Sequence, residues 1–197
     1  MRWDRAQGRR TMAEPKPRAT YQDLLEVPDS MVAEILGGEL YGSPRPALQH
    51  SVVSLELGGQ LWGPFRRGRG GPGGWWLSFE PELHFGDDVL VPDLAGWRRS
   101  RLPSIPATAA ISLAPDWICE VIAPSTERID RVRKLPIYAR DRVEHAWLIN
   151  PQTKTLEVFR RAEDGWILLF THGGDESVQA EPFGAIAIEL PALWGDV

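Results

Sequence analysis

The chain has 197 residues, of which 43% are hydrophobic and 25% are charged, the composition of one ordinary globular domain. Its net charge of −5 argues against purely electrostatic binding of nucleic acid, although it leaves room for a local basic groove. No stretch approaches the roughly 20 apolar residues that span a bilayer, and the basic N-terminus lacks the apolar segment of a secretory signal. The single cysteine, Cys119, cannot form an intramolecular disulfide, so we expect a cytoplasmic protein without membrane association.

The N-terminal segment differs from the rest in charge. Residues 1–18 carry six Arg or Lys and two acids, a net charge of +4, which leaves −9 for the remainder. Because the segment is polar and contains two prolines, we expect a disordered tail, with Met12 as an alternative start. We expect residues 19–197 to form a single domain.

The first half of the chain predicts a helical turn, two hairpins and a longer helix. Gly37-Gly38 is typical of a two-residue hairpin turn, and the apolar spacing from Leu48 to Leu61 predicts an amphipathic helix that ends in Gly63-Pro64. The stretch from Arg66 to Gly74 has the composition of a flexible loop, whose three arginines either bind phosphate or are merely solvated. The remaining elements are expected at Tyr21–Leu25 (capped by Thr20), Val32–Leu36, Glu39–Gly42, Trp75–Phe85 and Val89–Trp97.

The second half predicts a buried strand, a helix and an antiparallel meander. Residues 98–115 form a connection with room for a short helical piece, and Trp117–Ile122 is mostly apolar, as expected of a central strand. Ser125 can cap a helix that runs to Arg140. Further strands are expected at His145–Ile149, Leu156–Arg160, Trp166–Phe170 and Ala185–Leu190. The order fits an α/β (α+β) domain, with a mixed sheet and helices packed on it.

Two carboxylates interrupt apolar strands. Asp93 follows Pro92 near the middle of one expected strand, and Glu120 lies inside another. An ionised acid in an apolar strand is costly, and two on neighbouring strands repel each other unless a cation lies between them. Hard oxygen ligands suit Mg²⁺ or Mn²⁺. The sequence alone leaves a second interpretation open, in which each acid pairs with an arginine or Asp93 caps a strand end.

Lys134 is the third candidate, on the helix directly after the Glu120 strand. The connection is short, so this helix must fold back beside the strand, where a lysine could stabilise charge on a phosphoryl oxygen or orient a water. The alternative is an i,i+4 pair with Asp130 on an exposed helix face. Pro136 is expected to kink the helix just past Lys134.

An ordered set of short motifs resembles a known family. The set comprises Glu34-Ile35-Leu36-Gly37-Gly38-Glu39-Leu40, His50, Pro92-Asp93, Glu120-Val121-Ile122-Ala123-Pro124-Ser125, Lys134, Tyr138 and Trp147-Leu148-Ile149-Asn150-Pro151. It is similar to restriction-endonuclease-like proteins that are abundant in cyanobacteria and other bacteria and belong to the PD-(D/E)XK nuclease superfamily. The resemblance covers about residues 20–195.

The resemblance implies a central mixed sheet flanked by helices, with additional antiparallel hairpins, and Mg²⁺-dependent hydrolysis of DNA phosphodiesters. On this basis Asp93 and Glu120 hold the metal and Lys134 assists, while Glu39 and His50 are supporting candidates. The chain departs from the superfamily signature at Ile122, which occupies the lysine position two residues after Glu120. Relatives tend to have an apolar residue there and a lysine on the next helix, so Lys134 is the natural substitute.

Three function classes follow. The first is an active endonuclease. Cutting both strands usually takes two active sites, so we expect a homodimer. Its interface is expected to use those tryptophans that are exposed among Trp62, Trp75, Trp76 and Trp194. The second is a nuclease-fold binding or assembly module without turnover, favoured by the acidic body and Ile122. The third, a sugar-binding or structural sandwich, suits the tryptophans and the meander but not the two helices.

Overall fold

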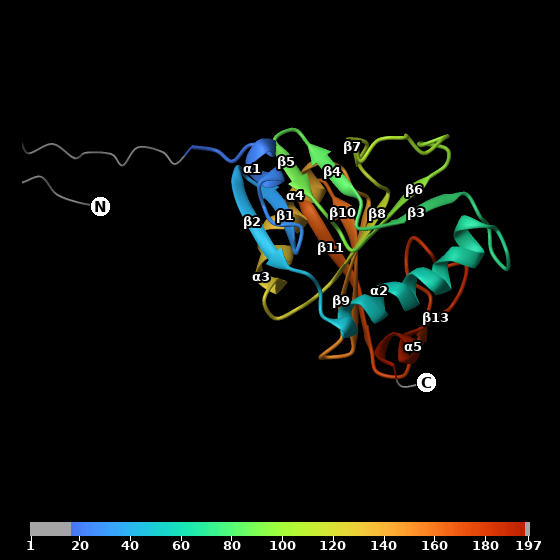
Figure 1. The fold of residues 1–197 in the computed structure, drawn as a ribbon. Helices are drawn as coiled ribbons and strands as arrows, with labels where there is room; N and C mark the ends of the chain where they lie inside the picture. Colours follow the sequence, from blue (N-terminus) through green and yellow to red (C-terminus); the bar gives the residue numbers. More distant parts are fainter. Residues whose placement is uncertain (1–16, 196–197) are drawn as a thin grey trace, which may run out of the picture.

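The structure is a computed structural model that describes residues 17–195. The tail predicted at residues 1–18 therefore lies almost entirely outside the described residues. Within residues 17–195, no helix is both long and apolar enough to cross a membrane. The described part of the chain forms two large sheets with helices packed against them (Figure 1).

The larger sheet has six strands and forms the centre of the fold. Only β8 and β9 run parallel in it, and its other neighbouring pairs are antiparallel, so the sheet is mixed as predicted. Its strand order is β11 (Gly165–Gly173), β10 (Thr155–Ala162), β9 (His145–Asn150), β8 (Trp117–Val121), β6 (Leu94–Arg98) and β3 (Trp75–Phe79).

The smaller sheet gathers the N-terminal hairpin and the tip of a second hairpin. Its order is β2 (Glu39–Pro44), β1 (Met31–Leu36), β5 (Asp88–Leu90), β4 (Glu82–Phe85) and β7 (Ala110–Ile111). Helix α1 (Tyr21–Leu25) precedes it, and Thr20 forms a capping box with Asp23, which confirms the predicted cap. A separate two-stranded ribbon joins β12 (Ser177–Val178) and β13 (Ile188–Glu189).

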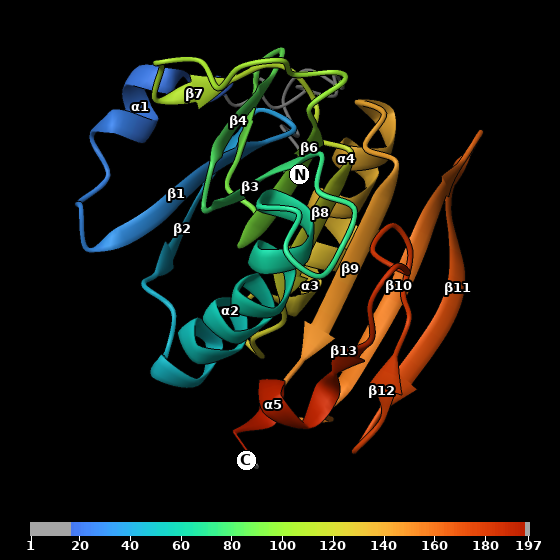
Figure 2. The same ribbon diagram turned by 90° about the vertical axis from the view of Figure 1, so that its right-hand side faces the viewer.

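Helices cover both faces of the six-stranded sheet. Figure 2 shows α2 (Leu48–Leu61) and α5 (Leu190–Trp194) on one side and α4 (Leu135–Arg140) on the other. Side chains of a strand alternate between faces. Trp117, Cys119 and Val121 of β8 accordingly join the core beneath α2 and α5, whereas Ile118 and Ile122 join the core beneath α4. The alternation places Glu120 on the α4 face.

Two predicted strands are each broken in two, which corrects the expectation for Trp75–Phe85 and Val89–Trp97. The first is interrupted at Glu80-Pro81, where Glu80 has a φ of 42°, and the second at Val91-Pro92-Asp93. Each break contains a proline, which has no N–H to donate to a ladder. The hairpin therefore bends and passes from one sheet to the other, and Asp93 lies in the bend rather than within a strand.

Both long helices contain a π-helical turn that the sequence did not predict. The first helix does not end at Gly63-Pro64, because the turn η1 (Trp62–Arg66) continues it. The second begins as α3 (Glu127–Ile129), with Thr126 rather than Ser125 before it, and passes through η2 (Asp130–Lys134) into α4. The turn η2 ends immediately before α4, whose first turn contains Pro136. Pro136 has no N–H to donate to a carbonyl one turn earlier, so a regular α-helical hydrogen-bond pattern would be interrupted there.

The remaining differences are small. Residues 98–115 contain the two-residue strand β7 and no helical piece. The last predicted strand is shorter than expected, because only Ile188 and Glu189 pair with β12 and the chain then enters α5. The meander β9–β10–β11 is confirmed.

Candidate active site

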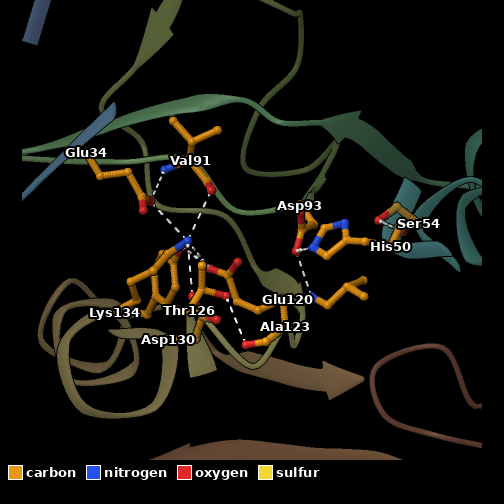
Figure 3. Close-up of polar contacts among 12 residues, drawn as sticks. Glu34, His50, Ser54, Val91, Asp93, Glu120, Ala123, Thr126, Asp130 and Lys134 are labelled. Carbon is orange, nitrogen blue, oxygen red and sulfur yellow. Dashed lines mark hydrogen bonds and ion pairs between the residues drawn. The ribbon is translucent and has the colours of Figure 1, made fainter. Parts of the chain in front are cut away.

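The predicted acids meet in a pocket of about 350 Å³ at the bend between the two sheets. The pocket is lined from four directions: by β1, by the start of α2, by the bend before β6, and by β8 with the helix after it. Figure 3 shows Lys134 between Glu34 and Glu120, with Asp93 and His50 beside them. Sequence segments from residue 34 to residue 134 thus converge on one site.

Glu120 and Lys134 form the buried centre of the pocket. Only 2% of Glu120 and 3% of Lys134 is exposed. Lys134 Nζ lies 2.8 Å from Glu120 Oε1, and the Tyr138 hydroxyl donates a hydrogen bond of 2.7 Å to the same oxygen. The short connection after β8 folds the helix back onto the strand, as the sequence predicted, and brings Lys134 to the Glu120 face.

Ile122 occupies the position, two residues after Glu120, where the sequence resemblance implies a lysine. Ile122 lies two residues after Glu120 and so points to the same face of the strand, where it is 3% exposed. It packs in the apolar core beneath α4, with Leu135 and Tyr138. A lysine at 122 would put a charge into that core, whereas Lys134 enters the pocket from the helix side.

Glu34 belongs to the site, although the sequence reasoning named it only within a motif. Its Oε1 lies 3.0 Å from Lys134 Nζ and accepts a hydrogen bond of 2.8 Å from the N–H of Val91. Lys134 donates to the carbonyl of Val91 at 3.1 Å. These two side chains replace the strand partners that the bend removes, and so fix the backbone just before Asp93. The signal available in the sequence was an acid among the apolar residues Ile35 and Leu36.

Asp93 is held by the neighbouring strand and by α2. Its Oδ2 accepts a hydrogen bond of 2.6 Å from the N–H of Val121 and lies 3.3 Å from His50 Nε2. Leu94 pairs with Cys119, so the next position in this antiparallel register sets Asp93 beside Glu120. The structure therefore brings Asp93, Glu120, Lys134 and His50 together, as the sequence predicted.

The pocket carries more negative than positive charge. Asp130, 5% exposed, adds a further acid 3.8 Å from Lys134 Nζ, so the i,i+4 pair exists but is buried rather than on an exposed face. Burial raises the pKa of Glu120 well above its usual value, and burial likewise raises the pKa of Asp130. Burial alone would lower the pKa of Lys134, but Glu120 and Glu34 raise it well above its usual value, so the ammonium is charged.

Glu39 is not brought to the pocket. Its carboxylate accepts a hydrogen bond of 2.7 Å from the Tyr41 hydroxyl and lies 3.8 Å from Arg133, with its side chain 62% exposed. Glu39 pairs with Leu36 beside the Gly37-Gly38 turn, whereas Glu34, which supplies the acid of the site, lies further from the turn, opposite Tyr41. We do not assign Glu39 to the site.

The donor set suits a hard divalent cation in its chemistry. Within residues 17–195, no group of three or more His, Cys, Asp or Glu side chains is arranged as a ready metal cage. Mg²⁺ needs fewer protein ligands than that, because it keeps several waters and is commonly bound through one or two carboxylates plus substrate phosphate. Asp93 and Glu120 meet this requirement, and the surplus of buried acids over Lys134 favours a bound cation.

His50 should titrate above its ordinary pKa in the metal-free protein. Burial lowers the pKa of His50, but its contacts with Asp93 outweigh burial and raise it above 6.5. A raised pKa means that the protonated form stabilises the fold below pH 6.5 and that this contribution is lost as the pH rises through the folded-state value. NMR titration of the imidazole in EDTA should show this, and Asp93→Asn should lower the value. A wild-type pKa at or below 6.5, or no change in the variant, would contradict this assignment.

Comparison with known proteins agrees with this architecture. A family model described as "Putative restriction endonuclease" (Uma2) matches residues 18–192. The chain belongs to this family. A crystal structure described as a "putative nuclease belonging to DUF820", from Anabaena variabilis, superposes with a TM-score of 0.72 at 21% sequence identity, covering 90% of this chain and 98% of that one. No curated protein matches the sequence. The match to the Anabaena structure confirms the predicted fold class, and the family match confirms the resemblance seen in the sequence.

Proposed function

We propose that this member of the Uma2 family is a Mg²⁺- or Mn²⁺-dependent endonuclease that hydrolyses DNA phosphodiester bonds in the cytoplasm. Asp93 and Glu120 hold the metal, and Lys134 assists. The proposal takes the site to be a variant of the PD-(D/E)XK arrangement. The observation that carries it is the 2.8 Å contact between Lys134 Nζ and Glu120 Oε1. Through this contact a lysine from the helix supplies the positive charge that Ile122 does not supply from the strand.

Each side chain has a role that its contacts support. A divalent ion bound at Asp93 and Glu120 would lower the pKa of a bound water and offset charge on the scissile phosphate. Lys134 holds Glu120 and the carbonyl of Val91 in place, and its positive charge stabilises negative charge that develops in the pocket. The His50 side chain, 13% exposed and beside Asp93, can hold or release a proton at the edge of the pocket.

One observation favours a second function, a nuclease-fold binding module without turnover. An ammonium group has three N–H donors. In Lys134 these face Glu34, Glu120 and the Val91 carbonyl at 3.0, 2.8 and 3.1 Å, so none is free for a substrate oxygen in this arrangement. On this alternative Lys134 only stabilises the buried acids.

Cleavage of supercoiled plasmid separates the two functions. The purified protein should nick the plasmid with Mg²⁺ or Mn²⁺ and stop when EDTA removes the metal, and activity should return when excess metal is restored. Folded protein that binds DNA but never nicks it, with either metal, would support the binding module instead.

A homodimer is part of the proposal, because cutting both strands calls for two sites. Of the tryptophans considered for its interface, Trp75 and Trp194 are buried, whereas Trp62 is 37% exposed. Light scattering on the preparation used for cleavage should give the mass of two chains, and a monomer mass would contradict this part of the proposal.

A further inference from the structure

Four arginines surround a second pocket. It lies at the far end of α2 from the pocket that contains Asp93, Glu120 and Lys134, which we call the catalytic pocket. The arginine pocket, of about 360 Å³, is lined by Trp62, Arg66, Arg67, Arg69 and Arg99. It contains no acidic residue in its lining, in a protein whose net charge is −5. Figure 1 shows α2 leading from the segment after β2 to the opposite end of the molecule, where η1 and the following loop lie. The two pockets are therefore distinct.

The guanidinium groups of this pocket lack the partners that other arginines have. Among the described residues, none of Arg66, Arg67, Arg69 and Arg99 makes an ion pair with a carboxylate, whereas Arg131, Arg140 and Arg161, for example, all do. Burial, followed by the charges of Arg99 and Arg67, lowers the pKa of Arg66. Like charges held together without a counter-charge favour binding of an anion.

Aromatic rings hold two of these arginines in place. The guanidinium carbons of Arg66 and Arg99 lie 4.1 and 4.3 Å from the ring centre of Trp76, and Arg66 also lies over Trp62 at 5.5 Å. Arg99 Nη2 donates a hydrogen bond of 2.8 Å to the Arg66 carbonyl. Its Nε is buried and makes no hydrogen bond to any described residue. Stacked, planar guanidinium groups are pre-organised for the paired hydrogen bonds that phosphate accepts.

The glycine-rich loop is fastened to the helix rather than free. Its backbone N–H groups at Arg69 and Gly73 donate to the carbonyls of Gly63 and Pro64, both at 2.9 Å. A Cβ on Gly71 would approach Pro64 Cβ to 2.5 Å, so only glycine allows this close contact. The loop carries Arg67 and Arg69 at defined positions, and the π-helical turn carries Arg66. The π-helical turn and the loop thus build one basic site.

We propose that the arginine pocket binds a backbone phosphate of the DNA on which the catalytic pocket acts. The inference rests on the proposed function, because its ligand is the DNA that the proposed nuclease would cleave. His50 and Arg66 are 16 residues apart along the continuous helical segment α2–η1, a separation of about 24 Å at 1.5 Å per residue. This separation corresponds to about seven nucleotides along one DNA strand. The pocket would anchor DNA away from the scissile bond, which explains how an acidic protein can hold a polyanion.

The test compares two double variants that remove the same charge. Arg67→Gln/Arg69→Gln removes two exposed, unpaired arginines of the pocket, and Arg142→Gln/Arg160→Gln removes two exposed arginines elsewhere. Fluorescence anisotropy in EDTA measures binding of a labelled duplex and of its single strand without cleavage. The pocket variant should bind duplex at least about tenfold more weakly, and its salt slope, log K against log salt, should be shallower by about 0.9, the contribution of one phosphate.

The control variant should bind as the wild type does, within about twofold. Equal losses in both double variants, or no loss in the pocket variant, would overturn the inference. The inference would also be overturned if the pocket variant lost only its affinity for inorganic phosphate, measured by competition, and kept its affinity for DNA. If the protein binds DNA in this way but never cleaves it, the proposed nuclease activity fails while the phosphate site stands; if cleavage occurs, the pocket variant should raise KM and leave kcat unchanged.

Discussion

Lys134→Met should lower the rate of plasmid cleavage by at least about 100-fold, the loss expected when a fixed positive charge that stabilises developing negative charge is removed. It should also reduce the free energy of unfolding by about 3–5 kcal/mol, because removal of one partner leaves buried charge uncompensated. In the structure Lys134 is 3% exposed and lies within 3.0 Å of both Glu34 and Glu120. Methionine keeps an unbranched side chain of similar bulk, without the terminal nitrogen and its three N–H donors.

The neighbouring residue provides a matched control for Lys134. Arg133 is 50% exposed on its side chain and lies 3.8 Å from the exposed Glu39, so Arg133→Gln removes the same charge from the same helix at a position that faces away from the pocket. It should leave cleavage within about twofold and stability within about 0.5 kcal/mol. Cleavage by Lys134→Met at the wild-type rate, at a temperature where the variant is folded, would contradict the role assigned to Lys134.

Asp93→Asn and Glu120→Gln should each reduce cleavage by at least about 1,000-fold, since loss of the metal costs several kcal/mol of transition-state stabilisation. Both substitutions keep the shape of the side chain and remove the charge that favours a cation. Asp93 accepts the Val121 N–H at 2.6 Å, which the amide oxygen of Asn can still accept, so the bend should survive. Cleavage assays across Mg²⁺ and Mn²⁺ concentrations measure the effect.

Glu39→Gln is the informative control for these two variants. Sequence reasoning placed Glu39 among the supporting residues, whereas the structure pairs it with Tyr41 and Arg133 on an exposed surface. Glu39→Gln should therefore cleave plasmid at a rate within about twofold of the wild type. A loss comparable to that of Asp93→Asn would contradict the placement of Glu39 outside the site.

Local pattern was sufficient for most elements of the fold. The alternation of the meander, the apolar run of β8, the Gly37-Gly38 turn and the cap at Thr20 are all short-range features, and the structure confirms them. The proline breaks are also local, but the apolar residues continue on both sides of Pro81 and Pro92. Apolar periodicity therefore predicted one strand where there are two in different sheets, both for β3 and β4 and for β5 and β6. It also predicted that Asp93 lies within a strand.

The site itself depends on contacts between distant segments. Asp93 and Glu120 stood out because each is a charge among apolar residues. Lys134 stood out because it lies on the helix directly after the Glu120 strand, and the short connection predicted that this helix would fold back toward Glu120. Glu34 could not be assigned, because its role comes from the Val91 peptide 57 positions along the chain. Nor did the sequence show that η2 buries Asp130 with Lys134, since a regular helix predicts the same pair on an exposed face.

Calorimetric titration of the metal-free protein with Mn²⁺ tests most directly whether Asp93 and Glu120 form a metal site. The wild type should bind one ion per chain, and Asp93→Asn should show no binding in the same concentration range, whereas Glu39→Gln should bind as the wild type does. Absence of binding by folded wild-type protein, or equal binding by wild type and Asp93→Asn, would contradict the metal site and with it the proposed nuclease.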